Sequence, residues 1–162
     1  METLLRSLFV ANAAPTCNNF PSDSSLHAGC HMKVTFDQFQ CSELENLMSA
    51  EITAWKDGDS CAASGYPGFY TLQLEDPGVC IRSTRLTANL QYTDSQIFSF
   101  TQLANGCQVT AQSQSQSLSM LDNCVNYCNM WNVFTGIGAF TLDNVSNCSE
   151  TPSDPVSTCA RY

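Results

Sequence analysis

The sequence predicts an α+β fold, in which an antiparallel sheet of four or five strands forms a meander and one long helix packs across it. Three observations carry this prediction. One segment repeats apolar residues at helical spacing, several short segments alternate apolar with polar residues, and ten cysteines are scattered over 162 residues. We expect an irregular N-terminal arm over 1–31, a single α+β domain over 32–143, and a C-terminal tail over 144–162 that a disulfide tethers.

The cysteines are scattered along the chain, form no CxxC pair, and show no repeat of the closely spaced ligands that a zinc site needs. An even number at scattered positions predicts a disulfide framework that forms in an oxidising compartment, which is the cell exterior, the cell surface or an organelle lumen. The pairing itself cannot be assigned from the sequence. The cysteines expected to form disulfides are Cys17, Cys30, Cys41, Cys61, Cys80, Cys107, Cys124, Cys128, Cys148 and Cys159.

The chain is acidic, with a formal net charge of −9. Nucleic acids and anionic bilayers bind basic surfaces, so neither is an expected partner. No apolar run is long enough to cross a bilayer. Residues 1–13 combine a short apolar run with the small residues of a cleavage site, and we interpret them as an ordered arm or a targeting remnant. Sequons at Asn144 and Asn147 are candidate glycosylation sites and favour a secretory route.

The clearest element is a helix over 42–57. Its apolar residues recur at intervals of four, four and three, which is the spacing of one helix face: Leu44, Met48, Ile52 and Trp55. Ser42 and Glu45 have the spacing of a capping box, which predicts the helix start, and Gly58 is the stop signal. Such an apolar stripe must be covered, so the helix is expected to lie on the sheet.

Alternation of apolar and polar residues predicts the strands. The expected strands, in chain order, are 32–39, 69–75, 85–93, 96–103 and one that begins at 107, with a possible last strand at 137–143. Turn residues separate them at 76–78, at 93–95, and at Asn105-Gly106, which is a strong hairpin signal.

The tract 111–120, AQSQSQSLSM, extends the strand that begins at 107. Its serines share a face with Val109, whereas Leu118 and Met120 fall on the opposite face. A β-bulge within 112–117 would bring Leu118 onto the face of Ala111. The alternative is that the strand leaves the core and its far end is covered on the opposite side. Small serine side chains allow a solvated edge or a small polar pocket between helix and sheet. The candidate pocket residues are Trp55, Ser113, Ser115 and Ser117.

The segment 122–134 predicts a short, irregular helix or a run of turns, because its asparagines compete for backbone hydrogen bonds. Tyrosine and tryptophan suit protein interfaces, although Trp131 also suits a core. The candidate interface residues are Asn123, Asn126, Tyr127, Asn129 and Trp131.

The sequence offers little to support catalysis. His27, Cys30 and His31 lie within five residues, but the surrounding glycine and serine residues indicate a loop and Cys30 is needed for disulfide pairing. The chain lacks a nucleophile-elbow motif and a glycine-rich phosphate loop. We therefore expect no catalytic residues, no metal site and no cofactor, and we expect that the protein is not an enzyme.

Residues Gln108–Gln112 superficially resemble the Gln-x-Val-x-Gly hairpin motif of the cystatins, and the order of strand, helix and further strands resembles that family's fold. Trp131 would stand for the family's second, aromatic loop. The match is incomplete, since Val109 is displaced by one position and Gln112 replaces the closing glycine. The resemblance implies a protease inhibitor.

The leading hypothesis is a non-catalytic extracytoplasmic interaction or structural protein, a subunit or linker of a larger assembly with protein partners. The alternative is a small-ligand carrier with a cavity between helix and sheet, and the third possibility is a cystatin-like protease inhibitor. A cavity lined by Trp55 and the serine row favours the carrier.

Overall fold

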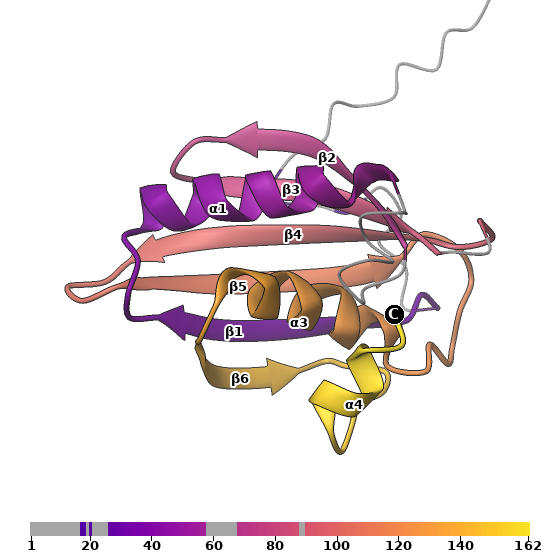
Figure 1. Ribbon diagram of the computed structural model, residues 1–162. Coiled ribbons are helices and arrows are strands. Elements are labelled where there is room, and N and C mark those ends of the chain that lie inside the picture. The colour runs from indigo at the N-terminus through magenta and orange to yellow at the C-terminus, as the bar shows by residue number, and fades with distance from the viewer. Residues whose placement is uncertain (1–16, 19, 21–25, 58–67, 88–89) are drawn as a thin grey trace, which may run out of the picture.

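The computed structural model describes residues 17–18, 20, 26–57, 68–87 and 90–162 (Figure 1). They confirm the α+β prediction, with six antiparallel strands in one sheet and helices packed on it. The elements, in chain order, are β1 (Gly29–Phe36), α1 (Cys41–Ala54), the 3-10 helix η1 (Trp55–Asp57), β2 (Phe69–Asp76), β3 (Cys80–Leu86), β4 (Thr93–Gln102), β5 (Cys107–Ser115), α3 (Val125–Ile137), β6 (Thr141–Ser146) and α4 (Pro155–Cys159).

The strands lie in the order β2-β3-β4-β5-β1-β6. Strands β2 to β5 form the predicted meander, and the Asn105-Gly106 turn joins β4 to β5. Gly106 has a φ of 101°, and a Cβ added at this position would clash with the main-chain carbonyl of Phe36. The last strand forms at 141–146 and pairs with β1. Because β1 also pairs with β5, it is an interior strand of the sheet.

Helices α1 and α3 both lie on one face of the sheet (Figure 1). The apolar stripe of α1 is buried as predicted, and Trp55 continues it in the 3-10 turn. Beneath the two helices, Phe36, Phe98 and Val109 of the sheet complete a single apolar core. Burial of this stripe explains why the helix forms at 41–54, since helices of this length gain most of their stability from packing.

The predicted capping box does not form. The helix begins at Cys41, with Gln40 as the N-cap residue, and no side chain caps it. The main-chain N–H of Cys41 donates instead to Gln102 on β4 (2.9 Å), and Cys41 forms a disulfide with Cys107. Glu45 accepts from the main-chain N–H of Gly78 (2.9 Å), so tertiary contacts determine the start of the helix.

Replacing Ser42 with alanine is therefore expected to change the free energy of unfolding by less than about 0.5 kcal/mol, as for other exposed positions. A capping serine replaced in this way costs typically about 1 kcal/mol. Urea denaturation of the wild type and the Ser42→Ala variant distinguishes the two values. A loss of 1 kcal/mol or more would show that Ser42 does cap the helix.

Four disulfides join distant parts of the described chain: Cys17–Cys80, Cys30–Cys148, Cys41–Cys107 and Cys128–Cys159. Cross-links of this number indicate an oxidising compartment. Cys148 and Cys159 tie the residues after β6 to β1 and α3. Within the described residues, no helix is long and apolar enough to span a membrane.

Cys124 departs from the expectation that every cysteine is paired, because it is a free thiol in the structure. The other eight described cysteines already have partners, so no described cysteine is left for it. Cys61 lies outside the described residues, as do the expected targeting remnant at 1–13 and most of the N-terminal arm.

The strand predicted at 85–93 and the turn predicted at 93–95 are both wrong. Strand β3 ends at Leu86, Leu90 adopts a left-handed turn conformation (φ 60°), and Asp94 and Ser95 are buried within β4. The reason is that the inward positions of β3 and β4 at this end of the sheet are polar. Apolar alternation therefore predicts the strand boundaries in the wrong place.

The predicted β-bulge in β5 is also absent. Strand β5 pairs with β4 and β1 without a change of register, and its odd-numbered residues face the helices from Cys107 to Ser115. The strand then ends. Leu118 and Met120 do not return to the core but lie exposed in the connection to α3.

Candidate functional site: a buried polar cluster beside an apolar rim

The sheet face beneath the helices changes from apolar to polar along three neighbouring strands. Ile81, Phe98 and Ala111 lie side by side in the apolar part, and each strand continues toward the same end with polar side chains. Strand β5 supplies serines, and α3 covers them with asparagines. The resulting polar cluster comprises Ser83, Arg85, Asp94, Gln96, Ser113, Ser115, Asp122, Asn126 and Asn129, all of them buried.

Asp94 is at the centre of this cluster. Its carboxylate accepts hydrogen bonds from Ser115 Oγ (2.8 Å) and Asn129 Nδ2 (2.9 Å), and Arg85 lies 3.9 Å away. Burial raises the pKa of Asp94, the negative charge of Asp122 raises it further, and the hydrogen bonds and Arg85 act in the opposite direction. Ionisation of Asp94 within this cluster is therefore less favourable than ionisation of an exposed aspartate.

Asn126 links α3 to the sheet through every polar atom of its side chain. Its Oδ1 accepts from Ser113 Oγ (2.8 Å), and its Nδ2 donates to the Ala28 carbonyl, to Ser115 Oγ and to Asp122 Oδ2 (3.1, 3.1 and 2.8 Å). Asp122 Oδ2 also accepts from the main-chain N–H of Asn126 (3.0 Å). Asp122 thus satisfies an N–H group in the first turn of α3.

The structure contradicts most of the interface that was predicted on α3. Asn126, Tyr127 and Asn129 are buried against the sheet, and Trp131 is half-buried beside Tyr127 and Phe140. Of the five residues proposed, only Asn123 is exposed. The asparagines recur on the inward face because the strands below them are polar, and their amides complete hydrogen bonds there.

The candidate pocket residues do not meet in one cavity. Trp55 packs edge-on against Tyr70, with ring centroids 4.9 Å apart, and Ser113 is covered by α3. Ser117 lies beyond the end of β5 and is exposed. Ser115 lines a cavity at the end of the sheet, away from Trp55.

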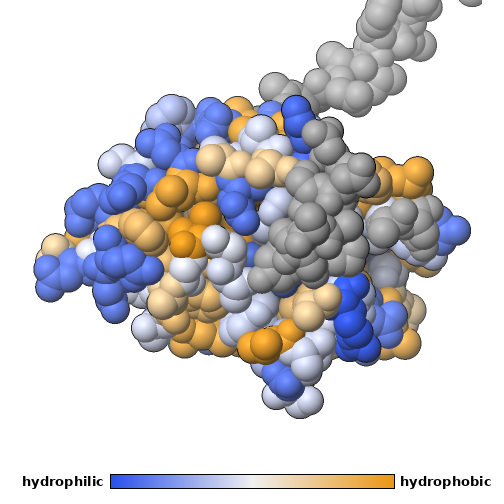
Figure 2. All heavy atoms as spheres, in the orientation of Figure 1, coloured by the Kyte–Doolittle hydropathy of each residue, from blue (hydrophilic) through white to orange (hydrophobic). Residues whose placement is uncertain are grey.

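That cavity has a volume of about 370 Å³ and lies where the polar cluster reaches the surface. Asp94, Ser115 and Asp122 contribute to it from below. Around it stand four apolar side chains, which we call the apolar rim: Tyr92, Leu118, Met120 and Leu121. The β5–α3 connection lies at the right-hand end of the molecule, where the space-filling view shows hydrophobic atoms beside hydrophilic ones (Figures 1 and 2).

The side chains of the apolar rim are unusually exposed for apolar residues. Leu118, Met120 and Leu121 leave 71%, 77% and 74% of their surfaces accessible, and Tyr92 adds about half of its own. Single exposed apolar residues are normal, but four around one cavity are typical of a binding surface. The rim was not predicted from the sequence, because a β-bulge was expected to return Leu118 and Met120 to the core face. The position of Leu118 and Met120 after the last alternating serine was the sequence signal that could have indicated the end of the strand.

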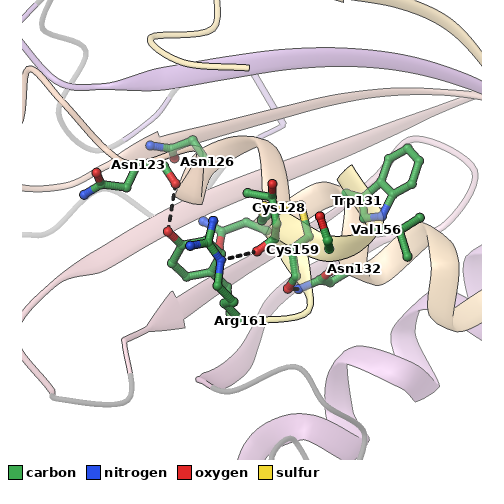
Figure 3. Close-up of a disulfide and its surroundings, with 12 residues drawn as sticks. Asn123, Asn126, Cys128, Trp131, Asn132, Val156, Cys159 and Arg161 are labelled. Atoms are coloured by element: carbon green, nitrogen blue, oxygen red, sulfur yellow. Dashed lines mark hydrogen bonds between the residues drawn. A yellow bond between two sulfur atoms is a disulfide. The ribbon is translucent and has the colours of Figure 1, made fainter. Parts of the chain in front are cut away.

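A second, shallower hollow lies on the other side of Asn123, toward the end of the chain. It is lined by Asn123, Cys124, Glu150, Thr151, Arg161 and Tyr162. Figure 3 shows how the Cys128–Cys159 disulfide fixes α4 against α3 near this hollow, with Asn132 donating to the Cys159 carbonyl (3.2 Å). Tyr162 Oη donates to the Asn123 carbonyl (2.8 Å), which connects the residues after α4 to the residue before Cys124.

The Cys124 thiol in this hollow is expected to be slow to alkylate. Burial, reinforced by the nearby charges of Glu150 and Asp122, raises its pKa above the ordinary value of 9.0, so less thiolate is present at neutral pH. Iodoacetamide labelling of the folded protein should be slower than labelling of N-acetylcysteine at neutral pH. The rate should continue to rise as the pH passes 9.0, and labelling at this position should be absent from Cys124→Ser. If Cys124 remains unlabelled after denaturation without reductant, it is disulfide-bonded.

The histidine pair identified in the sequence does not gather metal ligands. Cys30 is bonded to Cys148, and His31 lies on β1, where burial lowers its pKa. Among the described residues, no three potential ligands come together. The sequons at Asn144 and Asn147 are both exposed, which leaves their amides accessible to modification.

Comparison of the chain with protein-family models, curated proteins and solved structures returns no match. The residues that resemble the cystatin motif, Gln108–Gln112, lie in the middle of β5 and pair with β4 on one side and β1 on the other. They do not form a projecting hairpin. The polar cluster, the cavity and the apolar rim are therefore the features of the structure that bear on function.

Proposed function

We propose that the protein is a non-catalytic, extracytoplasmic interaction protein, and that it binds a protein partner through the apolar rim. The observation that carries the proposal is the exposure of Leu118, Met120 and Leu121 within one short connection, beside Tyr92. Among the described residues, the apolar core forms without these side chains. Interfaces are enriched in methionine and tyrosine, which supports a protein partner.

The energetics support a contact of useful strength. Full burial of one leucine or methionine side chain contributes about 1.5–3 kcal/mol. Part of that gain is offset by the loss of freedom on association. A rigid support reduces the remaining cost, and the rim is held by β5 and α3, which the polar cluster joins through Asn126. Preorganisation of this kind favours binding without rearrangement of the sheet.

A second candidate is the small-ligand carrier, which the cavity of about 370 Å³ favours. This volume is near the lower limit for ligand sites, which span roughly 300–1,000 Å³. The cavity opens within the rim rather than between α1 and the sheet, where Trp55 and Tyr70 are packed together. For these reasons we propose the protein partner first.

Site-specific photo-cross-linking in the organism of origin tests the proposal. A photoreactive amino acid is placed at Leu118 or Leu121, and in a matched control at Val156, which is 72% exposed on α4. Cross-links to the same partner are expected from both rim positions and not from position 156. Equal cross-linking from all three positions would contradict the proposal, as would a complete lack of protein adducts at the rim.

A further inference from the structure

We propose that the partner presents a lysine or arginine side chain between apolar neighbours, and that this side chain enters the cavity to pair with Asp122. The inference rests on the proposed function and names the chemistry of the partner. Asp122 lines the cavity and retains only 7% of its surface accessibility. Its Oδ2 already accepts two hydrogen bonds from Asn126. Its Oδ1 is shielded from water and has no donor among the described residues.

An acceptor left in this state is unfavourable. A buried polar atom without a hydrogen bond costs about 1–3 kcal/mol, and more when the group is charged. A bound ammonium or guanidinium group would supply the missing donor, and charge-assisted hydrogen bonds are about twice as strong as neutral ones. The chain therefore gains most from a cationic donor at this position. Because Oδ1 is shielded, the incoming side chain must displace a neighbouring group to reach it.

The electrostatic surroundings also favour a cation. Asp94 lines the same cavity, and the two carboxylates are close enough that the charge of Asp122 opposes ionisation of Asp94. Arg85 is directed to Asp94 and to the main-chain oxygen of Tyr162 (3.2 Å). The whole chain carries a formal net charge of −9. A basic partner segment is thus attracted at long range and paired at short range.

The shape of the site suits a long side chain with a charged end. The apolar rim surrounds the opening, whereas Asp94, Ser115 and Asp122 lie below it. Lysine and arginine place their methylene stems against apolar surfaces while the charged group contacts a polar one. Apolar residues on either side of the cation would then cover Leu118 and Met120. This combination distinguishes the site from a general acidic surface, which would not select for apolar neighbours.

Fluorescence polarisation with labelled heptapeptides tests the inference. The flanking positions are drawn from leucine, isoleucine, valine and phenylalanine, and the central position is lysine, arginine, norleucine or glutamate. Norleucine has the lysine stem without the charge. We expect the lysine and arginine peptides to bind at least tenfold more tightly than the norleucine peptides. Met120→Ser should weaken binding of every peptide, because it removes part of the rim.

Asp122→Asn should abolish the preference for the cation, and Asp143→Asn is the matched control, since Asp143 is an exposed carboxylate on β6. The asparagine oxygen can still accept from Asn126, so the fold should be retained. If that variant fails to fold, the lysine and norleucine comparison on the wild-type protein decides the question alone.

Equal affinity for lysine and norleucine peptides would overturn the inference, as would a hexylammonium ion that binds as tightly as a lysine peptide. Absence of any peptide binding would also overturn it. Rim cross-links that persist in that last case would leave the proposed function standing, so the two failures are distinguishable.

Discussion

Replacement of Arg85 by methionine is expected to lower the free energy of unfolding by about 3–5 kcal/mol, the usual effect of removing one partner from a buried ion pair. The side chains of Arg85 and Asp94 are both 3% accessible, and the closest charged atoms are 3.9 Å apart. Without the guanidinium, the buried Asp94 carboxylate faces Asp122 with no compensating charge. The Arg85 contact to the main-chain oxygen of Tyr162 is lost as well.

The pH dependence of this loss follows from the raised pKa of Asp94. A carboxyl group that binds its proton more tightly in the folded state than in the unfolded state destabilises the fold when it is ionised. The positive charge of Arg85 lowers the pKa of Asp94. Substitution of Arg85 by methionine therefore raises that pKa further. The deficit of Arg85→Met should therefore be largest above the folded-state pKa. It should shrink as the pH falls through the folded-state pKa values of Asp94 in the variant and then in the wild type, both above the ordinary value of 3.8, because the carboxyl is then protonated in both folded proteins.

Guanidinium denaturation at several pH values measures both effects. The double variant Arg85→Met/Asp94→Asn is the control, since it removes both charges and keeps an oxygen that can accept from Ser115 and Asn129. We expect it to recover more than half of the lost stability. A deficit below about 1 kcal/mol for Arg85→Met, independent of pH, would show that the pair contributes as little as a surface ion pair.

Phe134→Ala is the second substitution with a large expected effect, a loss of about 3–5 kcal/mol. The Phe134 ring is fully buried at the centre of the aromatic part of the core. Its centroid lies 6.0 Å from that of Phe36, 5.8 Å from Phe98 and 5.6 Å from Phe140. Removal of the ring leaves a cavity where α3 meets β1 and β4. The edge-on contacts, worth about 0.5–1.5 kcal/mol beyond burial, are lost with it.

Thermal and chemical denaturation of three variants tests this prediction. Phe134→Leu keeps most of the apolar volume and should cost roughly 1.5 kcal/mol. Val156→Ala alters an exposed side chain on α4 and should be neutral within about 0.5 kcal/mol. If Phe134→Ala and Val156→Ala destabilised the protein equally, α3 would not pack on the sheet as described.

Prediction from the sequence succeeded where the buried side chains are apolar. The α1 stripe and the alternation in β1 and β5 follow the periods of a helix and a strand, because their inward faces meet the hydrophobic core. The scattered cysteines likewise pointed correctly to a disulfide-rich fold. These signals are local and need no knowledge of the partner strand.

Prediction failed where the buried side chains are polar. Ser83 and Arg85 face inward from β3, and Asp94 and Gln96 face inward from β4, so hydrophobic alternation gives no sign of either strand end. Asn126 and its neighbours on α3 were assigned to a surface for the same reason. Apart from Asp122, the partners of Asn126 lie 11 to 98 positions away in the chain, and only the sheet register brings these groups together.

The candidate site combines one correct signal with several misplaced ones. The serine row was correctly identified as the unusual feature of β5, and Ser113 and Ser115 do face the interior. The expected bulge, however, wrongly placed Leu118 and Met120 in the core. In the structure these residues leave the sheet and form the apolar rim, since the strand ends two residues before Ser117.

Native mass spectrometry of the protein isolated from its source, with wild type compared with Leu118→Ser/Leu121→Ser, tests whether the apolar rim binds a partner protein. Both substituted side chains are exposed, so the variant should fold normally. We expect the wild type to be recovered in a complex with another protein and the rim variant to be recovered as the free chain. Recovery of the same complex from both forms, or of the free chain alone from the wild type, would contradict this expectation.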